Sequence, residues 1–396
     1  MDSSTLPKNS SDAPVRRMHP GLLALAVGGF GIGLTEFVIA GLLTGVADAL
    51  RVSVPAAGAL IWGYALAVVV GAFTVTAVLS RRPPKGALLL LLALFVAGNA
   101  LTTLAPDFGV ALLGRVVTAL CHGGFFGIGA VVAGDLVASD RKASAIAFMF
   151  GGLTLSNVLG VPFGTFVGQH LGWRSAFWII SALGVLAVIG VAALVPRMSA
   201  PPPTAGSHFA VLFRRQVVVS ILLTMMVFGG VFGAFIYVEP LVTRVTGYGD
   251  GAVPWLLVLF GIGLFIGNFV GGWAADRNLT WTLRVLTVLL PIVLIGYGLL
   301  AAWRLPVAVL LVAMGVVGFA ATPALQLRVM RFAEDAPTMA SAANIAAFNL
   351  GNAMASAIGA ATIALGLGWR SPVWVGATMA LIGTVLVFTN NHGEPQ

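Results

Sequence analysis

Three ionisable residues lie far inside long apolar stretches of the sequence: Glu36, Arg115 and His122. A charged side chain costs about 2.5 to 3.5 kcal/mol at the centre of a bilayer, so such residues in a membrane span are candidates for function. Glu36 and Arg115 lie at similar depth, which predicts that they can form an ion pair. The pair would either fasten two helices together or, when Arg115 moves, let Glu36 take up and release a proton. His122 would relay protons, contact a substrate, or be satisfied by a backbone carbonyl.

Uncharged polar and aromatic residues in other apolar stretches are candidates for contact with a substrate. Helical spacing puts Asn344, Phe348 and Asn352 on one face, where amides suit either a polar, uncharged ligand or hydrogen bonds between helices. An aromatic stretch near residue 230 suits an amphipathic compound, or else packs against the core or lipid. The predicted substrate-cavity residues are His122, Asn157, Phe232, Tyr237, Gln326, Asn344, Phe348 and Asn352.

Patterns for other kinds of chemistry are missing from the sequence. Cys121 is the single cysteine, which excludes an internal disulfide and a cysteine-based metal cluster. No phosphate-binding Gly-Lys-Ser/Thr loop occurs, and a glycine pattern at residues 296–301 lies within an apolar stretch instead of following a strand. We therefore expect no enzyme activity, no cofactor and no bound metal.

The composition identifies the class of protein. Of the 396 residues, 59% are hydrophobic and 9% are charged, whereas soluble domains have about 25% charged residues. Twelve apolar stretches are long enough to cross about 30 Å of hydrocarbon as a helix. We predict an all-α membrane protein with twelve transmembrane helices. They cover residues 21–46, 56–80, 86–105, 109–138, 143–169, 174–196, 216–239, 253–275, 281–302, 306–330, 338–367 and 371–390.

Lysine and arginine are distributed unevenly between the two sides of the predicted bilayer. An even number of spans puts both termini on one side, and most basic residues of the turns, Arg328 included, fall on that side. Because positively charged loops stay in the cytosol, both termini are predicted to be cytosolic. The net charge of +8 therefore reflects topology and not a nucleic-acid partner. The basic residues predicted on the opposite side are Arg51, Arg174, Arg244, Arg304 and Arg370.

The chain divides into two related halves. The sequence Gly-Trp-Arg-Ser at residues 172–175 recurs at residues 368–371, and the same spacing relates Arg81 to Arg277 and Gly71 to Gly267. Such duplication is typical of transporters with a central site between two rocking halves. The predicted units are a disordered cytosolic tail at 1–20, six-helix bundles at 21–196 and 216–390, a cytosolic linker at 197–215 and a short tail at 391–396.

Three local patterns resemble the major facilitator superfamily, and within it the drug:proton antiporters with twelve spans. Residues 33–38, Gly-Leu-Thr-Glu-Phe-Val, resemble the first-span signature of bacterial exporters of sugars, purine nucleosides and chloramphenicol. Residues 114–127, around Arg115, resemble the fourth-span motif, and Gly160, Pro162 and Gly164 resemble the fifth-span antiporter motif. The resemblance covers essentially the whole chain. It implies the major facilitator fold, proton coupling through Glu36 and Arg115, and a cavity lined by spans one, four, seven and ten.

The loops after spans two and eight differ in how well they match the family pattern. The family pattern has an aspartate before the arginine, but the first loop has Ser80 before Arg81, whereas the second keeps Asp276 before Arg277. The family carboxylate belongs to an interdomain charge relay at one gate, so the resemblance assigns a gating role to Arg81, Asp276 and Arg277. The Gly-Pro pair of span five is also split, by Val161.

These features predict a proton-coupled exporter of small organic molecules such as drugs, sugars or nucleosides. It would be a monomeric, multi-pass protein of a bacterial cell membrane, with the substrate, protons and the lipid bilayer as partners. Uptake by symport or facilitated diffusion is the alternative, because direction follows the coupling gradient. A membrane sensor without transport is a more distant alternative.

Overall fold

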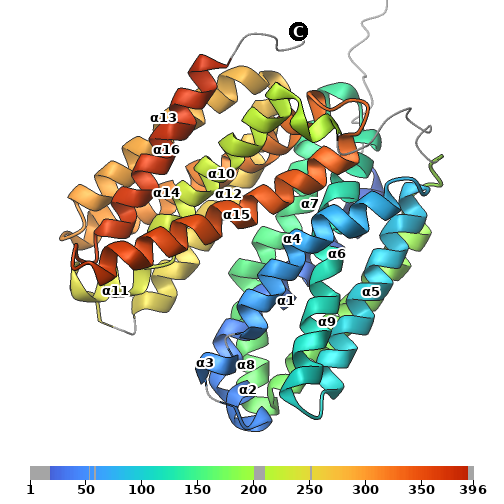
Figure 1. The fold of residues 1–396 in the computed structure, drawn as a ribbon, viewed down its shortest axis with the longest axis horizontal. Coiled ribbons are helices and arrows are strands. Elements are labelled where there is room, and N and C mark those ends of the chain that lie inside the picture. The colour runs from blue at the N-terminus through green and yellow to red at the C-terminus, as the bar shows by residue number, and fades with distance from the viewer. Residues whose placement is uncertain (1–17, 53, 58, 200–209, 250–251, 391–396) are drawn as a thin grey trace, which may run out of the picture.

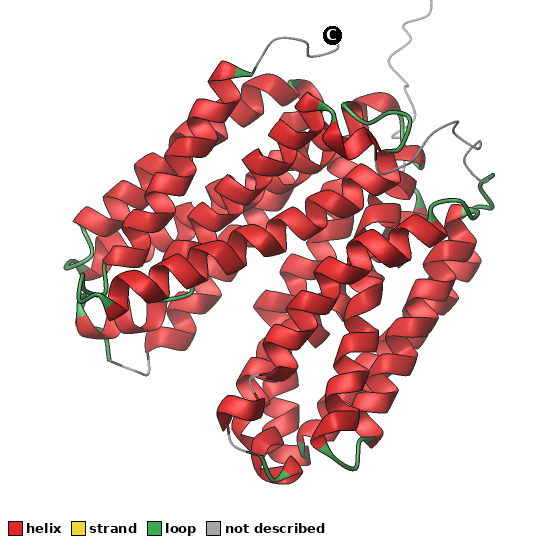
Figure 2. Cartoon of the chain, viewed as in Figure 1, coloured by secondary structure: helices red, strands yellow, loops and turns green. Residues whose placement is uncertain are grey.

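The computed structural model describes residues 18–52, 54–57, 59–199, 210–249 and 252–390, which are helical and contain no strand (Figure 2). Most of the predicted tails, 1–17 and 391–396, and residues 200–209 of the predicted linker lie outside the described residues. The first half of the chain, here called the N-half, contains α1 (Pro20–Val38), η1 (Ile39–Leu42), α2 (Leu43–Leu50), α3 (Val54–Ala57), α4 (Ala59–Leu79), α5 (Pro84–Leu104), α6 (Phe108–Asp135), η2 (Ser139–Arg141), α7 (Lys142–Leu155), η3 (Ser156–Gly160), α8 (Val161–Leu171) and α9 (Trp173–Leu194). The second half, the C-half, contains η4 (Ala210–Phe213), α10 (Arg215–Phe235), α11 (Val238–Arg244), α12 (Val253–Arg277), α13 (Leu279–Leu299), α14 (Arg304–Arg331), α15 (Pro337–Ala364) and α16 (Ser371–Thr389).

Local sequence signals fix where several of these helices begin. Asp107 accepts a hydrogen bond from the backbone N–H of Val110 at the start of α6, and Asn278 accepts one from Trp281 at the start of α13. These caps satisfy N–H groups that have no partner within the helix. Helices α5, α12, α15 and α16 have proline in the first turn, where its missing N–H costs nothing.

Eleven described helical segments are long and apolar enough to cross a membrane. One of them, Ser139–Leu171, joins η2, α7, η3 and α8, as the predicted span at 143–169 requires. Helix α15 is 28 residues long but is not among the eleven, and it carries Asn344, Asn349 and Asn352. Eleven of the twelve predicted spans therefore have the expected apolar character, and α15 is the polar exception.

One basic residue is placed differently from the prediction. We expected Arg328 in a cytosolic turn, but it lies inside α14 with 1% of its surface exposed. Its Nε donates to the Ser220 hydroxyl at 3.2 Å, and its guanidinium lies 4.9 Å from the centre of the Phe332 ring. The hydrogen bond to Ser220 of α10 gives this arginine a partner where it is buried inside the helix.

The two halves repeat details of backbone packing. A side chain at Gly71 would collide with the Leu120 carbonyl, which lets α4 pack closely on α6, and Gly267 meets the Val316 carbonyl in the same way between α12 and α14. Gly172 and Gly368, at the related turns before α9 and α16, both have positive φ angles of 85° and 81°, a conformation that glycine adopts without strain. These equivalences support the duplication inferred from the sequence.

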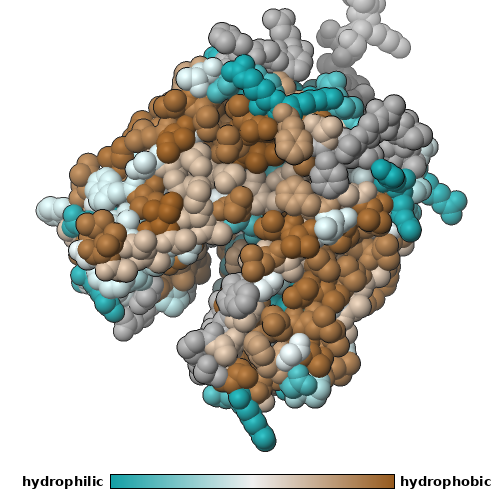
Figure 3. Space-filling model, viewed as in Figure 1, coloured by the Kyte–Doolittle hydropathy of each residue, from teal (hydrophilic) through white to brown (hydrophobic). Residues whose placement is uncertain are grey.

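The outer surface around the middle of the molecule is apolar. Figure 3 shows hydrophobic side chains covering the flanks of both halves, with hydrophilic residues gathered toward the ends. Large apolar residues such as Leu66, Phe166, Ile189 and Val309 are more than half exposed. A surface of this kind is stable against lipid, so the chain is a multi-pass membrane protein.

The halves meet at one end and separate at the other (Figure 1). At the closed end α7 packs against α12 and α15 packs against α4 and α6. The amide of Asn268 donates to the Ala147 carbonyl at 2.5 Å, and Gly127 lies against Ala342. At the opposite end the space-filling view shows a cleft between the halves (Figure 3). The turns α6–α7 and α12–α13 and the start of α1 lie together at the closed end.

Candidate functional site

A cavity between the halves brings together residues from both. We call it the central cavity; it measures about 70 Å³. The N-half contributes one acid, one histidine and apolar side chains, whereas the C-half contributes four phenylalanines and uncharged polar groups. Its lining residues are Glu36, Phe37, His122, Phe150, Leu153, Phe228, Phe232, Phe319, Thr322, Ile345, Phe348, Asn349 and Asn352.

Glu36 lies on the N-half wall of the central cavity and faces His122. Its Oε2 is 3.8 Å from His122 Nδ1, and the side chain of Glu36 is 19% exposed while that of His122 is 5% exposed. The Tyr64 hydroxyl lies 3.3 Å from the same Nδ1. Helices α1, α4 and α6 thus hold a carboxylate, a phenol and an imidazole in one continuous chain of contacts. Glu36 and His122 line the cavity, whereas Tyr64 is buried behind them.

Arg115 is buried behind this chain of contacts. Its Nη1 donates to the Thr35 carbonyl at 2.6 Å, and its Nε donates to the Leu60 carbonyl at 3.1 Å. The guanidinium also lies 4.2 Å from the centre of the Tyr64 ring, a favourable cation–π distance. In the part of the chain that the structure describes, the buried Nη2 atom has no hydrogen-bond partner.

The expected Glu36–Arg115 ion pair is not formed in this conformation. Among described residues the basic side chain within 4 Å of the Glu36 carboxylate is that of His122, and Arg115 instead donates to backbone carbonyls of α1 and α4. Thr35 connects the two residues: its carbonyl binds Arg115, and Glu36 follows it in the chain. The arginine is therefore next to the acid without neutralising it directly.

A second polar cluster in the C-half is satisfied internally. Asn344 accepts from the Thr224 hydroxyl at 2.6 Å and donates to Gln326 Oε1 at 2.8 Å, while Gln326 donates to the Ser341 hydroxyl. We call Thr224, Gln326, Ser341 and Asn344 the amide network. The network joins α10, α14 and α15, and neither Gln326 nor Asn344 lines the central cavity. For Gln326 and Asn344, hydrogen bonds between helices therefore account for the buried amide side chains.

The other predicted cavity residues divide into two groups. Phe232, Phe348 and Asn352 line the central cavity together with His122. Asn157 instead donates to the Leu153 carbonyl of its own helical segment at 3.2 Å. Tyr237, between α10 and α11, donates to the Ser356 carbonyl at 2.8 Å, away from the cavity lining.

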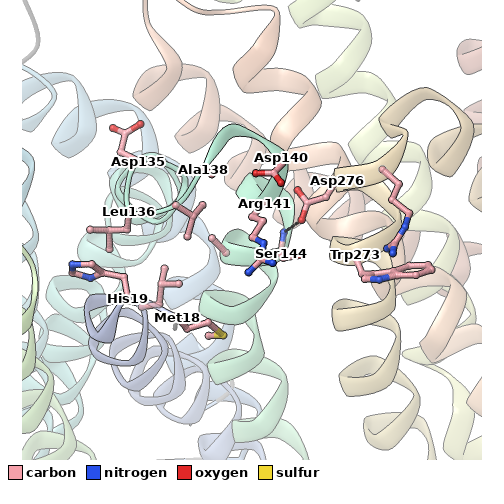
Figure 4. A pocket seen from close by; sticks show the side chains of 14 residues that line it. Met18, His19, Asp135, Leu136, Ala138, Asp140, Arg141, Ser144, Trp273 and Asp276 are labelled. Atoms are coloured by element: carbon pink, nitrogen blue, oxygen red, sulfur yellow. Dashed lines mark hydrogen bonds between the residues drawn. The ribbon is translucent and has the colours of Figure 1, made fainter. Parts of the chain in front are cut away.

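Two of the three predicted gating residues, Asp276 and Arg277, line a larger cavity of about 930 Å³ at the closed end (Figure 4). The Asp276 carboxylate accepts from the backbone N–H groups of Ala143 and Ser144 at 2.7 and 2.9 Å. It thereby caps the first turn of α7 across the two halves, where a helix favours negative charge. Arg277 stacks on the Trp273 ring, 3.5 Å from its centre, and Arg81 is exposed at the α4–α5 turn.

The glycines of the predicted antiporter motif are packing positions. Gly160 lies against Phe30 and Leu34, and Gly164 lies against Val38 and Leu34, so η3 and α8 pack closely on α1. Pro162 is exposed in the first turn of α8. The motif therefore positions the helix that carries Glu36 and contributes no lining residue of the central cavity.

Several residues at or behind the cavity escaped the sequence reasoning. Thr322 and Phe319 of the lining, and Tyr64 behind it, sit in apolar stretches where their types are common, so only the fold distinguishes them. Tyr64 carried one usable signal, because the sequence has only four tyrosines. Among the residues that the structure describes, no three His, Cys, Asp or Glu side chains come close enough to bind one metal ion.

Comparison with known proteins settles the family. The sequence matches the profile of the Major Facilitator Superfamily over residues 25–356 and again over 221–396. This chain belongs to the Major Facilitator Superfamily. The resemblance of its motifs to that family is thereby confirmed, and so is its assignment to membrane transporters instead of enzymes.

Relatives within the superfamily match nearly the whole chain. It is 42% identical over 376 residues to the inner membrane transport protein YdhP of Escherichia coli K12, covering 95% of this chain and 97% of that protein. It is 33% identical over 375 residues to a chloramphenicol resistance protein of Streptomyces lividans, covering 93% and 95%. The fold matches that of the superfamily transporter FucP in its outward conformation, with a TM-score of 0.78, 13% identity and coverage of 94% and 99%.

Proposed function

We propose that this chain is a proton-coupled exporter of small organic molecules in a bacterial inner membrane, acting as a monomer by alternating access. The observation that carries the proposal is the position of Glu36. It is the one carboxylate among the residues lining a cavity shared by both halves, and it faces His122. A proton bound there interacts with the same space that a substrate would occupy, which is what coupling requires.

Arg115 supplies the second state of the proton site. Its Nη2 atom is buried without a partner, and its Nη1 already holds the carbonyl of Thr35 next to Glu36. A small rotation of α1 would bring the Glu36 carboxylate to that unfilled donor. Deprotonated Glu36 would then pair with Arg115, and protonated Glu36 would return to the cavity wall beside His122. The two protonation states thereby favour two positions of α1.

The proposed orientation and the proton gradient together can drive export. With both termini cytosolic, as the basic turns favour, the cleft opens to the outside and the closed end faces the cytosol. Protons entering from outside down a potential of about 100 mV supply about 2.3 kcal/mol each, enough for a gradient of about 50-fold at 1.4 kcal/mol per tenfold. The similarity to a chloramphenicol resistance protein favours export.

The proposal can be tested by proton movement in liposomes. The purified chain is reconstituted with an internal pH dye, a pH gradient is imposed, and chloramphenicol, sugars and nucleosides are added in turn. A transported compound should dissipate the gradient. Glu36→Gln cannot release a proton, so we expect its coupled rate to fall about 100-fold, the scale of losing a positioned acid–base group.

Glu334→Gln is the matched control, because Glu334 is exposed in the turn between α14 and α15. It should behave as the unmodified chain. If Glu36→Gln keeps the proton signal, Glu36 is not the proton site. Flux of labelled substrate without proton movement would instead indicate facilitated diffusion.

A further inference from the structure

The C-half wall of the central cavity has an aromatic surface built from four phenylalanines. The Phe228 ring lies 4.1 Å from the Phe348 ring and 5.5 Å from the Phe319 ring, measured between centroids, and Phe232 lies 5.9 Å from Phe228. Helices α10, α14 and α15 each contribute to this surface. Such a surface takes an aromatic or apolar group and offers it no charge.

Two polar atoms on the same wall lack partners. Thr322 and Asn352 line the central cavity, and among the described residues the Thr322 hydroxyl and the Asn352 Oδ1 atom are buried without a hydrogen-bond partner. Thr322 is only 1% exposed. Buried polar atoms are nearly always paired in folded proteins, so an unpaired one calls for an explanation.

Several buried threonines elsewhere in the bundle pair with their own helix, although Thr76 and Thr282 do not. The hydroxyls of Thr102, Thr118 and Thr287 donate to the carbonyl four residues earlier at 2.7 to 2.9 Å. Thr322 makes no such bond. Pro323 follows it, and because proline has no N–H, the Phe319 carbonyl receives no backbone hydrogen bond from that position. The wall therefore holds hydrogen-bonding capacity that the protein does not use.

The amide network shows that buried polar groups on these helices can find hydrogen-bond partners within the protein. Gln326 lies one turn beyond Thr322 on α14, and Asn344 lies two turns from Asn352 on α15; both are 0% exposed and hydrogen-bonded to other side chains. Gln326 and Asn344 lie outside the cavity lining, whereas Thr322 and Asn352 lie in it. Other unpaired buried polar atoms of the described residues, such as the Thr76 hydroxyl and Asn268 Oδ1, lie away from the cavity. It is therefore the position of Thr322 and Asn352 beside the rings that points to a ligand as their partner.

We propose that Thr322 and Asn352 bind a hydroxyl or amide group of an uncharged aromatic substrate whose ring packs on Phe228, Phe319 and Phe348. The proposal deepens the proposed function by naming the substrate class. It follows from the unpaired polar atoms beside the rings, and from the lack of charged residues among the C-half side chains that line the cavity. The cavity of about 70 Å³ holds only part of such a molecule, so the phenylalanines must move apart on binding.

The test measures binding without any proton gradient. Purified full-length chain in lipid nanodiscs is titrated with radiolabelled chloramphenicol, an uncharged nitrophenyl compound with two hydroxyls and an amide, and with its derivative in which both hydroxyls and the amide nitrogen are methylated. Thr322→Val and Asn352→Leu remove the polar atoms and keep the volume approximately. Each should weaken chloramphenicol binding about 5- to 10-fold, the effect of one lost hydrogen bond, and leave binding of the methylated derivative unchanged.

Thr287→Val is the matched control, because that hydroxyl bonds its own helix away from the cavity. It should leave both affinities unchanged. Equal losses for both compounds in the cavity variants, or no loss for either, would overturn the proposal, as would failure of the unmodified chain to bind chloramphenicol. Proton release by Glu36 plays no part in this readout, so a failure of proton coupling leaves the binding result interpretable.

Discussion

The two halves share a fold but furnish the central cavity with different chemistry. On the N-half side, a chain of ionisable groups reaches the cavity at Glu36 and His122 and continues behind it through Tyr64 to Arg115. On the C-half side, the lining is aromatic and the polar groups are uncharged, with the amide network behind them. The two halves therefore share their helix packing but differ in the residues that face the cavity. This difference fits the proposal that the N-half binds protons and the C-half binds substrate.

The closed end repeats this asymmetry. Asp276 of the C-half caps the first turn of α7 in the N-half. Ser80, the related residue of the N-half, instead donates to the Ala77 carbonyl of its own helix at 3.1 Å. At these related turns the carboxylate comes from the C-half, whereas in the central cavity it comes from the N-half.

The largest expected effect comes from changing the buried cation of the N-half. Arg115→Lys keeps the charge but loses the planar fork that binds two carbonyls at once. We expect proton-coupled transport to fall about 100-fold, because misplacing a positioned group costs rate on this scale. Substrate binding without a gradient should stay within about threefold of the unmodified chain. Arg197→Lys, at an exposed arginine after α9, is the control. Equal loss of binding and coupling would break the proposed division between the halves.

A smaller effect is expected from the C-half amide network, and on stability more than on coupling. Gln326→Leu leaves Asn344 and Ser341 without their partner in a buried site. An unsatisfied buried polar group costs about 1 to 3 kcal/mol, so the thermal midpoint in detergent should drop by several degrees. The pH dependence of transport should not change. Gln169→Leu, at an exposed position of α8, is the control. A shifted pH profile in Gln326→Leu would mean that the C-half takes part in proton coupling.

The smallest effect is expected for the phenol between Arg115 and His122. Tyr64→Phe keeps the ring under the guanidinium and removes the hydroxyl that lies near His122 Nδ1. We expect a two- to fivefold lower coupled rate, consistent with one neutral hydrogen bond of about 0.5 to 1 kcal/mol. Rates measured from pH 5 to 9 should also show an altered profile. An unchanged profile would show that His122 and Glu36 act independently of Tyr64.

The sequence anticipated the positions of most helices and part of the site. Helix boundaries lie within a few residues of the apolar stretches, because hydrocarbon length and starting caps or prolines are local signals. Glu36 and His122 were identifiable because a charged or titratable group deep in lipid is costly. The prediction put Arg328 in a cytosolic turn because an arginine near the end of an apolar stretch usually marks the cytosolic side of the membrane. Its burial could not be predicted without knowing that Ser220 is its hydrogen-bond partner.

Other site residues depended on contacts between distant segments. Gln326 and Asn344 carry the same side-chain chemistry as Asn352, and nothing along the chain distinguishes a satisfied amide from an unsatisfied one. The ion-pair prediction had the right two residues in neighbouring helices. The pair is not formed in this conformation because the carbonyls of Thr35 and Leu60 bind the guanidinium, and the sequence does not show where backbone carbonyls lie.

By itself the sequence determined that this protein is a helical membrane protein built from a duplicated unit, because hydropathy, length and repeated motifs are properties of the chain alone. Only the tertiary structure decided which polar residues face the cavity and which face each other. The reason is physical. A polar side chain within the membrane needs a hydrogen-bond partner, and whether it faces a neighbouring helix or the cavity depends on how helices distant in the sequence pack together.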